Sequence, residues 1–292
     1  MSRISATSRV FALLGDPVGH SLSPEIQNAA MSTAGVDGVY VAMATLEADL
    51  AGLMRGLARS GGGGNVTLPH KEKAASILDR PNSTVRRTGA CNTFWAEDDG
   101  TVVGDNTDVE GFRRAIARFI QGGPRDARVL MLGAGGAARA ALVALLDDGV
   151  EEVRILNRSV ERARLVSRRI GGERVRVVTA ASELSDENFD LIVNATRLGL
   201  EEDDPLPLDL EVPGRVGAVF DMVYAENGTP FVRAAEARGI RATDGIEMLI
   251  QQGAAAFERW WDIEAPLEAM REAFARRRAA LRPTPDAGEA QI

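Results

Sequence analysis

Residues Val129 to Arg139 read VLMLGAGGAAR, and this segment indicates the fold class most clearly. Its first four residues form an apolar run typical of a buried strand, and an alanine- and leucine-rich helical segment follows the glycines to Leu146. The loop matches G-x-G-x-x-A, which turns tightly, lets the backbone approach a pyrophosphate, and aims a helix N-terminus at the anion. A glycine turn after a strand is common, but here a second strand also follows in order. The sequence therefore predicts a dinucleotide site at Gly133, Ala134, Gly135, Gly136 and Ala137.

The residues after that second strand, Val153 to Leu156, indicate which dinucleotide binds. An NAD enzyme usually places Asp or Glu there, where it accepts from the ribose 2′-hydroxyl. This chain instead reads Asn157-Arg158-Ser159-Val160-Glu161-Arg162. Two guanidinium groups suit a 2′-phosphate, which a carboxylate would repel, although both arginines could also be solvated residues of a helix start. We predict NADP, bound by Asn157, Arg158, Ser159 and Arg162.

The alternation of strands and helices continues on both sides of the glycine loop. After the glycine loop we expect strands at Val153 to Leu156, Val175 to Val178, Leu191 to Val193 and Ala218 to Phe220. Before it we expect strands at Val10 to Leu14 and Val39 to Ala44, and a hairpin that joins Phe94-Trp95 to Thr101–Val103. We expect helices at Glu47 to Arg59, at Lys71 to Leu78 and after Ser23, which would be the N-cap with Pro24 in the first helical position. A four-glycine turn is expected at Gly61 to Gly64. Repeated β-α-β units of this kind imply parallel sheets.

We therefore predict a two-domain α/β fold. Residues 1–108 form an α/β substrate domain, which the largely helical segment 244–280 completes. Residues 109–243 form a Rossmann-type doubly wound NADP-binding domain. The tail, 281–292, is expected to be disordered.

Composition narrows the functional classes. A chain of 292 residues suits two domains, and a net charge of -8 argues against nucleic acid as the partner. One cysteine, Cys91, excludes an internal disulfide and fits the cytoplasm; we expect it to be a buried filler rather than a catalytic thiol. Because the chain has only two histidines and one cysteine, we do not expect a metal site. No segment resembles a signal peptide or a membrane span. We expect a small-molecule substrate and leave monomer and homodimer open.

Two polar motifs carry the chemistry: NVTLPHK at residues 65–71 and GDNTD at residues 104–108. Each ends in an ionisable residue, Lys71 or Asp108. Beside a dinucleotide, the ammonium can donate a proton to the oxygen of the carbonyl group that receives hydride. The carboxylate can hold both that amine and a substrate hydroxyl. The pair suits reduction of a polyhydroxylated carbonyl compound.

In order along the chain, these motifs resemble the shikimate dehydrogenase family from about Phe11 to Trp260. The resemblance rests on GDPVGHSLSP (15–24), NVTLPHK, GACNT (89–93), GDNTD, GAGGA, NRSVER (157–162), NAT (194–196), DMVY (221–224), DGIEML (244–249) and Gln252. It implies NADPH-dependent reduction of 3-dehydroshikimate to shikimate, in the pathway that makes chorismate for aromatic amino acids. Lys71 would be the acid/base and Asp108 its partner. Further site residues implied are Ser21, Ser23 and Tyr224 at the substrate carboxylate, Asn65, Thr67, Asn92, Thr107 and Gln252 at ring hydroxyls, and Met222 and Gly245 at the cofactor.

Each assignment has a structural alternative. Ser23 or Asp108 could cap its helix, Asn65 could satisfy backbone groups, Lys71 could be a surface lysine, and Gln252 could face solvent. Gln27 stands where the family commonly has His, and Arg197 where it commonly has proline.

Paralogues acting on quinate or aminoshikimate share most of the pattern, although the serine pair favours shikimate. A catalytically silent NADP-binding regulator is the alternative from another class. Retention of Lys71 and Asp108 argues against the silent regulator, since binding a nucleotide needs neither.

Overall fold

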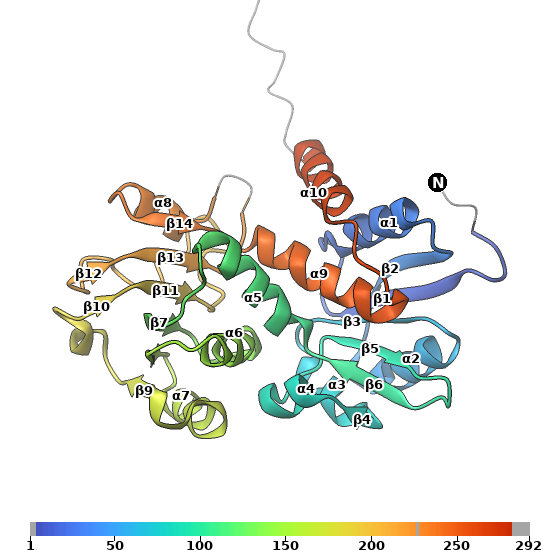
Figure 1. Ribbon diagram of the computed structural model, residues 1–292, viewed down its shortest axis with the longest axis horizontal. Coiled ribbons are helices and arrows are strands. Elements are labelled where there is room, and N and C mark those ends of the chain that lie inside the picture. The colour runs from blue at the N-terminus through green and yellow to red at the C-terminus, as the bar shows by residue number, and fades with distance from the viewer. Residues whose placement is uncertain (1–3, 226–227, 282–292) are drawn as a thin grey trace, which may run out of the picture.

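The computed structural model describes residues 4–225 and 228–281. Two six-stranded sheets lie side by side, each covered by helices, and α5 (Thr107–Phe119) and α9 (Ile246–Trp261) run between them (Figure 1). The last helix, α10 (Leu267–Leu281), packs on α1 (Ser23–Ala34). The rest of the predicted disordered tail, 282–292, lies outside the described residues.

The first sheet has the strand order β2-β1-β3-β5-β6-β4. Side chains of its inner strand β1 alternate between two cores, as the strand period of two requires. Phe11 and Leu13 enter the core shared with α1 and α9, whereas Ala12 and Leu14 enter the core formed with α2. The elements not yet bounded are β1 (Arg9–Gly15), β2 (Gly38–Ala44), β3 (Gly63–Val66), β4 (Arg80–Pro81), β5 (Thr93–Ala96), β6 (Val102–Asp105), α2 (Glu47–Arg59), α3 (Lys71–Ile77) and α4 (Ser83–Thr88).

One local prediction for this sheet is wrong in part, and one for the neighbouring helix α1 is wrong. Of the four glycines predicted as a turn, Gly63 and Gly64 instead begin β3, whereas Gly61 and Gly62 precede it, and only Gly61 has a positive φ, +85°. A Cβ at Gly64 would lie 2.2 Å from the carbonyl oxygen of Ala12, so glycine is needed there for close strand approach. Ser23 does not cap α1: the cap position is Leu22, and the Oγ of Ser21 accepts from the backbone N–H of Ser23 at 3.2 Å.

The second sheet has the order β14-β13-β11-β7-β8-β9, and every pairing within it is parallel. Its direction of winding reverses beside β7, the place where doubly wound sheets bind ligands at the carboxyl ends of their strands. The strands are β7 (Arg128–Leu132), β8 (Glu152–Leu156), β9 (Val175–Val178), β11 (Leu191–Asn194), β13 (Ala218–Asp221) and β14 (Arg241–Thr243), with β10 (Asn188–Phe189) and β12 (Arg215–Val216) paired separately. The helical elements are α6 (Gly136–Asp147), α7 (Val160–Val166), α8 (Pro230–Glu236), η1 (Ser167–Gly171), η2 (Gly172–Arg174) and η3 (Ala181–Leu184).

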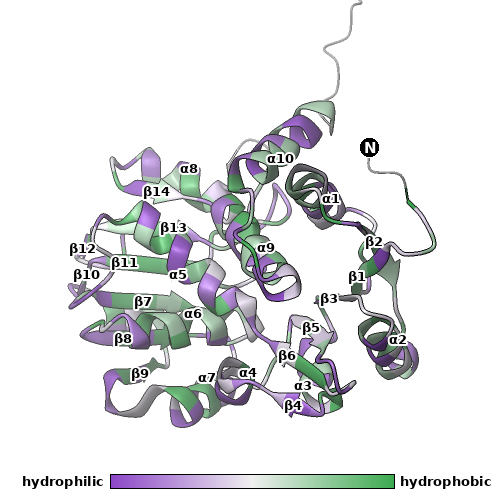
Figure 2. Ribbon diagram, turned by 45° about the vertical axis from the view of Figure 1, so that its right-hand side comes forward, coloured by the Kyte–Doolittle hydropathy of each residue, from purple (hydrophilic) through white to green (hydrophobic). Residues whose placement is uncertain are grey.

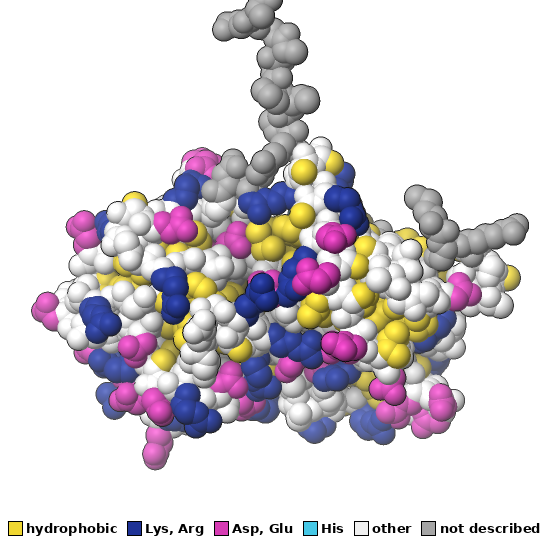
Figure 3. Space-filling view, turned by 45° about the horizontal axis from the view of Figure 1, so that its top comes forward, with side chains coloured by type: hydrophobic (Ala, Val, Ile, Leu, Met, Phe, Trp, Pro, Cys, Tyr) yellow, Lys and Arg dark blue, Asp and Glu magenta, His cyan; other side chains and the backbone are white. Residues whose placement is uncertain are grey.

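The interior and the surface differ in hydropathy. Figure 2 shows hydrophobic residues along β7 and β11, while hydrophilic residues gather on the helices and loops around them. On the face drawn in Figure 3, cationic and acidic side chains are interspersed rather than separated by sign. No helix within 4–225 or 228–281 has the length and apolarity to cross a membrane.

The helices α5 and α9 join the two halves of the molecule. Val109, Phe112 and Ile116 of α5 pack into the core of the second sheet, whereas Phe257 of α9 packs into that of the first. The two helices also pack on each other, so closely that a Cβ at Gly111 would lie 2.5 Å from the Cβ of Gln252. This close approach brings the polar residues of α9 to the start of α5.

Candidate active site

An ammonium and a carboxylate meet where α3 and α5 begin. The Nζ of Lys71 donates to Oδ2 of Asp108 at 2.6 Å, and the Nδ2 of Asn92 donates to Oδ1 of the same carboxylate at 2.8 Å. The side chains of Lys71 and Asp108 are 20% and 8% exposed, so water screens the pair only partly. An ammonium has three N–H donors, and Lys71 therefore retains donors for a ligand after it bonds Asp108.

The local backbone explains why Asp108 is available for this contact. Asn106 occupies the cap position of α5, and its side-chain oxygen accepts from the backbone N–H of Asp108 at 3.3 Å. The alternative in which Asp108 caps α5 is therefore wrong. Asp108 lies in the first turn, where the helix dipole favours a negative charge. Lys71 begins α3, where the dipole disfavours a cation, and the Asp108 carboxylate offsets this.

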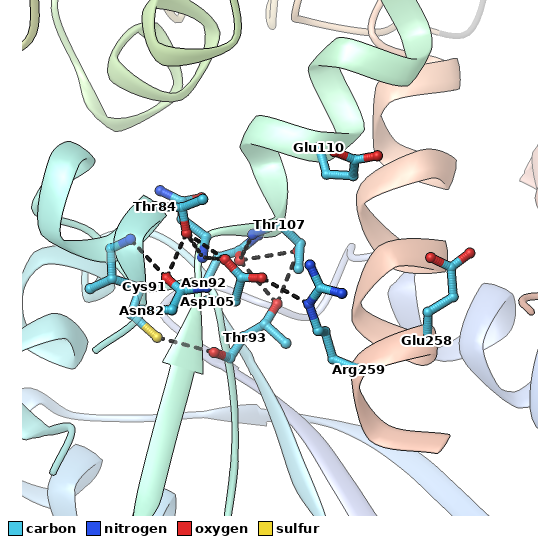
Figure 4. Close-up of polar contacts among 12 residues, drawn as sticks. Asn82, Thr84, Cys91, Asn92, Thr93, Asp105, Thr107, Glu110, Glu258 and Arg259 are labelled. Carbon is cyan, nitrogen blue, oxygen red and sulfur yellow. Dashed lines mark hydrogen bonds and ion pairs between the residues drawn. The ribbon is translucent and has the colours of Figure 1, made fainter. Parts of the chain in front are cut away.

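A buried hydrogen-bond network lies beneath this pair. The Oδ1 of Asn92 accepts from both the backbone N–H and the hydroxyl of Thr107, at 2.7 and 3.1 Å (Figure 4). Asn65 donates from Nδ2 to the backbone oxygen of Asn92 at 3.0 Å and to the hydroxyl of Thr93 at 2.9 Å. The hydroxyl of Tyr40 in turn donates to Oδ1 of Asn65 at 2.8 Å. Satisfied buried networks are rigid, so these side chains hold Asn92 and Thr107 in fixed directions.

The sequence motifs gave no role to Tyr40, which lies outside them, or to Thr93, the last residue of GACNT. Both lie in strands, where aromatic and β-branched residues are ordinary, so their type carried no functional signal. Burial raises the pKa of the Tyr40 hydroxyl, which therefore stays protonated and acts as a donor.

Gln252 reaches the same network from α9. Its Oε1 lies 3.5 Å from Nδ2 of Asn92, a long contact, and its Nε2 donates to the carbonyl oxygen of Leu249 at 2.9 Å. Gln252 is partly buried, so the alternative that it simply faces solvent is wrong. Gln27, the departure from the family's usual His, is buried on α1 and donates to the carbonyl oxygen of Gly253 at 2.8 Å. This bond ties α1 to α9 one residue from Gln252.

The remaining predicted substrate residues stand apart from that network. Ser21, Ser23 and Thr67 are partly buried near the carboxyl ends of β1 and β3, and Tyr224 packs edge-on against Phe274 of α10 at 6.2 Å between ring centroids. Within the described ranges, no hydrogen bond joins any of these four side chains to Lys71, Asp108 or Asn92.

The glycine loop has the shape that a pyrophosphate requires. Gly133 has φ +110°, and a Cβ there would lie 2.9 Å from the carbonyl oxygen of Ala195. At Gly135 and Gly136 an added Cβ would meet nothing within 4 Å, so the protein's own packing does not demand glycine there. Those two glycines leave open space before the first turn of α6, whose free N–H groups suit an anion. The loop therefore fits a dinucleotide.

The end of β8 fits a 2′-phosphate. Arg158 and Arg162 are exposed, and no acidic side chain among the described residues forms an ion pair with either. Their neighbours have structural contacts: Ser159 caps α7 by accepting from the N–H of Arg162 at 3.4 Å, and Asn157 donates to the backbone oxygen of Ser159 at 2.8 Å. Two unpaired guanidinium groups on one short turn fit NADP better than NAD.

A buried carboxylate, to which the sequence analysis assigned no role although it opens the DMVY motif, lies at the end of β13. Asp221 accepts from Nδ2 of Asn194 at 2.8 Å, from the N–H of Val223 at 3.0 Å and from the hydroxyl of Thr229 at 2.6 Å. Burial raises the pKa of Asp221 to about 6 despite these donors. The following residue, Met222, lies so close to Gly245 that a Cβ on the glycine would be 2.3 Å from its carbonyl oxygen.

Two ion pairs join the two halves of the molecule beside the site. Arg139, in the first turn of α6, pairs with Glu72, the residue after Lys71. Arg87 of α4 donates two bonds to the carboxylate of Asp147, at 2.8 and 2.7 Å.

Cys91 is buried, and burial raises the pKa of its thiol to about 12, so it is not a nucleophile at neutral pH. Among the residues that the structure describes, no group of three or more His, Cys, Asp or Glu is placed to hold a metal ion.

Three family models match separate parts of the chain. Residues 13–94 match the family model described as shikimate dehydrogenase substrate binding domain, residues 115–199 the model shikimate / quinate 5-dehydrogenase, and residues 245–273 the model shikimate 5'-dehydrogenase C-terminal domain.

Whole-chain relatives give the same result. Shikimate dehydrogenase (NADP(+)) from Geobacter metallireducens is 41% identical, covering 92% of this chain and 96% of that protein. The protein of the same name from Rubrobacter xylanophilus is also 41% identical, covering 93% and 97%. Among solved structures, shikimate dehydrogenase from Aquifex aeolicus aligns with a TM-score of 0.84 at 32% identity, covering 93% of this chain and 99% of that one. The Thermus thermophilus shikimate 5-dehydrogenase in complex with NADP(H) and shikimate aligns at 0.81 and 37% identity, covering 92% and 99%.

Proposed function

This chain belongs to the shikimate dehydrogenase family, and from that premise we propose that it reduces 3-dehydroshikimate to shikimate with NADPH, reversibly. The observation that carries the proposal is the Lys71–Asp108 contact of 2.6 Å, to which Asn92 adds a bond to the same carboxylate. Glu72, the residue after Lys71, pairs with Arg139 of the helix that follows the glycine loop. Binding a nucleotide requires neither Lys71 nor Asp108, so their contact argues for chemistry and against a silent NADP-binding regulator.

The protein's part in the reaction is proton transfer and orientation. NADPH, held by the 133–137 loop and by Arg158 and Arg162, would supply the hydride. Lys71 donates a proton from Nζ to the carbonyl oxygen of the substrate as that oxygen becomes a hydroxyl. In the oxidation direction the neutral amine takes the proton back. Asp108 keeps the amine beside that oxygen and accepts from a neighbouring ring hydroxyl.

The other polar residues would orient the ring. Asn65, Thr67, Asn92, Thr107 and Gln252 present amide and hydroxyl groups that suit the remaining hydroxyls of the acid. Asn92 and Thr107 are fixed by their mutual hydrogen bonds before substrate arrives, which reduces the entropy lost on binding. Ser21 and Ser23, with Tyr224 nearby, would bind the substrate carboxylate through hydroxyl donors. Met222 and Gly245 would line the cofactor near its reacting end.

The division of labour follows the predicted domains. Residues 1–108 with 244–280 would bind substrate, and residues 109–243 would bind NADP. Movement of the two parts about α5 and α9 would then exclude water around the reacting atoms. The protein would act in the cytoplasm, in chorismate biosynthesis, as a monomer or homodimer; its one cysteine, free and buried, suits a reducing compartment.

A substrate panel tests the function. Purified protein is assayed in the oxidation direction with shikimate, quinate and aminoshikimate, each with NADP and with NAD, by following the absorbance of the reduced cofactor. We expect kcat/KM to be highest for shikimate with NADP. A preference for quinate or aminoshikimate would assign a paralogue, and no turnover of any acid by a folded, NADP-binding protein would favour the regulator.

A further inference from the structure

A buried carboxylate that the proposed mechanism does not use lies three residues before Asp108. Asp105 ends β6, and its side chain is 4% exposed. Such a group is costly to bury unless donors surround it. Burial raises the pKa of Asp105, but hydrogen bonds from Thr84, Asn82 and Arg259 outweigh burial and hold that pKa below its ordinary value. Asp105 is therefore a buried charge that its neighbours stabilise.

The contacts of Asp105 fix the loop that carries the catalytic groups. Its Oδ1 accepts from the backbone N–H of Asn106 at 2.6 Å and from the hydroxyl of Thr84. Its backbone oxygen accepts from the N–H of Asn92 at 3.1 Å. Asn106 is the residue whose side chain caps α5 at Asp108. Asp105 thus contacts both residues that orient Asp108, one through its side chain and one through its backbone.

Arg259 connects this loop to α9. Its Nε donates to Oδ2 of Asp105 at 2.9 Å, across 154 positions of sequence (Figure 4). Arg259 lies seven residues after Gln252, which is two helical turns, so both side chains leave the same face of α9. One of them reaches Asn92 and the other reaches Asp105. The two contacts hold one face of α9 against neighbouring points of one polar network.

We propose that Asp105 and Arg259 form a positioning pair, which keeps Asp108 and Asn92 in register with Lys71 and with Gln252. The role rests on the proposed function for its catalytic consequence, although the geometry it fixes can be measured without substrate. Neither residue touches the reacting atoms in this arrangement. Both act through Asn106 and Asn92, and loss of the pair loosens the turn at residues 105–108.

The chain offers a matched control on the same two helices. Glu258, adjacent to Arg259, accepts two bonds from Arg114 of α5, at 3.1 and 2.8 Å. This pair also ties α9 to the helix that begins at Thr107, but within the described residues neither side chain forms a hydrogen bond or an ion pair with the loop at residues 104–108. Glu258→Gln therefore removes an ion pair between α5 and α9 while it leaves the positioning pair intact.

The experiment compares Asp105→Asn, Arg259→Gln, the double variant and Glu258→Gln. We measure kcat, the KM for shikimate and for NADP, and amide hydrogen exchange of residues 105–110 without ligands. Because each single variant loses a charge-assisted bond, we expect its kcat to fall about tenfold or more, with little change in the KM for NADP. The kcat of the double variant should fall no further than that of the more affected single variant, because the two single substitutions remove the same interaction. Arg259→Lys, which keeps a cation, should recover part of the loss.

Exchange at residues 105–110 should be faster in Asp105→Asn and Arg259→Gln and unchanged in Glu258→Gln. Wild-type kcat together with wild-type exchange in Arg259→Gln would overturn the proposal, and so would equal losses in the control. If Asp105→Asn does not fold, Arg259→Gln carries the test, since the Arg259 side chain is 48% exposed and its replacement is mild. Inactivity of the wild type on shikimate would refute the proposed function alone, because the exchange rates would still decide the role of the pair.

Discussion

Replacing Lys71 by Ala separates proton transfer from simple substrate binding. A positioned general acid contributes about 100- to 10,000-fold to rate, which is about 3–5 kcal/mol of barrier. We expect kcat to fall within that range. The KM for shikimate should change much less, because the bond from Nζ to the reacting oxygen strengthens mainly as negative charge develops there.

The structure also gives the stability cost of this change. Asp108 is 8% exposed and would lose a partner at 2.6 Å, but it would keep the bond from Asn92 and its favourable place in the first turn of α5. Breaking a buried pair costs about 3–5 kcal/mol when nothing else compensates. With these compensations, we expect the free energy of unfolding to fall by about 1–3 kcal/mol, which a domain of ordinary stability tolerates.

Lys73→Ala is the matched control. Lys73 lies on the same helix, its side chain is 50% exposed, and its only ion pair in the described chain is a 3.8 Å contact with Glu47. Both variants are assayed at saturating NADP with shikimate varied, after thermal unfolding has shown that each is folded. The control should match the wild type. A near-normal kcat with a raised KM for shikimate in Lys71→Ala would mean that the lysine only anchors the acid, and the catalytic role would be refuted.

Three further changes test other parts of the structure. Replacing Arg158 and Arg162 by Ala should raise the KM for NADP by about tenfold or more and that for NAD little, and equal weakening of both would contradict the 2′-phosphate assignment. The pKa of Asp221 is about 6 in the folded protein, above the ordinary value of 3.8, so the folded state binds this proton more tightly than the unfolded state does. The free energy of unfolding should therefore fall as the pH rises from about 4 to about 6. Asp221→Asn should remove that decline, of up to about 3 kcal/mol, in urea unfolding measured across pH; an unchanged slope would assign it to other groups. Gly111→Ala should separate α5 from α9 at Gln252, costing about 1–3 kcal/mol and lowering kcat, whereas wild-type thermal stability would show that the helices are not so closely packed.

The second sheet was predictable almost to the residue because its strands are continuous apolar runs. The strand predicted at Val175 to Val178 has those bounds, and those predicted at Leu191 to Val193 and Ala218 to Phe220 each extend by one residue. Buried parallel strands give this strong local signal. β14 (Arg241–Thr243) was missed, since an edge strand of three residues that begins with Arg has no such pattern.

Local propensity failed where tertiary contacts decide. The glycines at 63 and 64 have the composition of a turn, yet they form β3, where the backbone of the neighbouring strands approaches too closely for a Cβ. Ser23 has the ideal type for a cap, but the Oγ of Ser21 bonds its N–H instead.

The site shows the same limit. Its sequence motifs contain Asp105 and Asp221 but gave neither residue a role, and they do not contain Tyr40. Each of these three matters through a hydrogen bond to a residue distant in the chain, and that partner is visible only in the fold.

The position of shikimate relative to Lys71 in a ternary complex decides whether this lysine is the general acid. The measurement is a crystal structure of the protein with NADP and shikimate, in which the position of the ring is read relative to Lys71 and Asp108. We predict that Nζ of Lys71 lies within hydrogen-bond distance of the hydroxyl whose carbon faces the nicotinamide. Asp108 should bond the same or the adjacent hydroxyl, and the substrate carboxylate should lie near Ser21 and Ser23. A shikimate carboxylate bound to Lys71, with the reacting carbon turned away from the nicotinamide, would contradict this prediction.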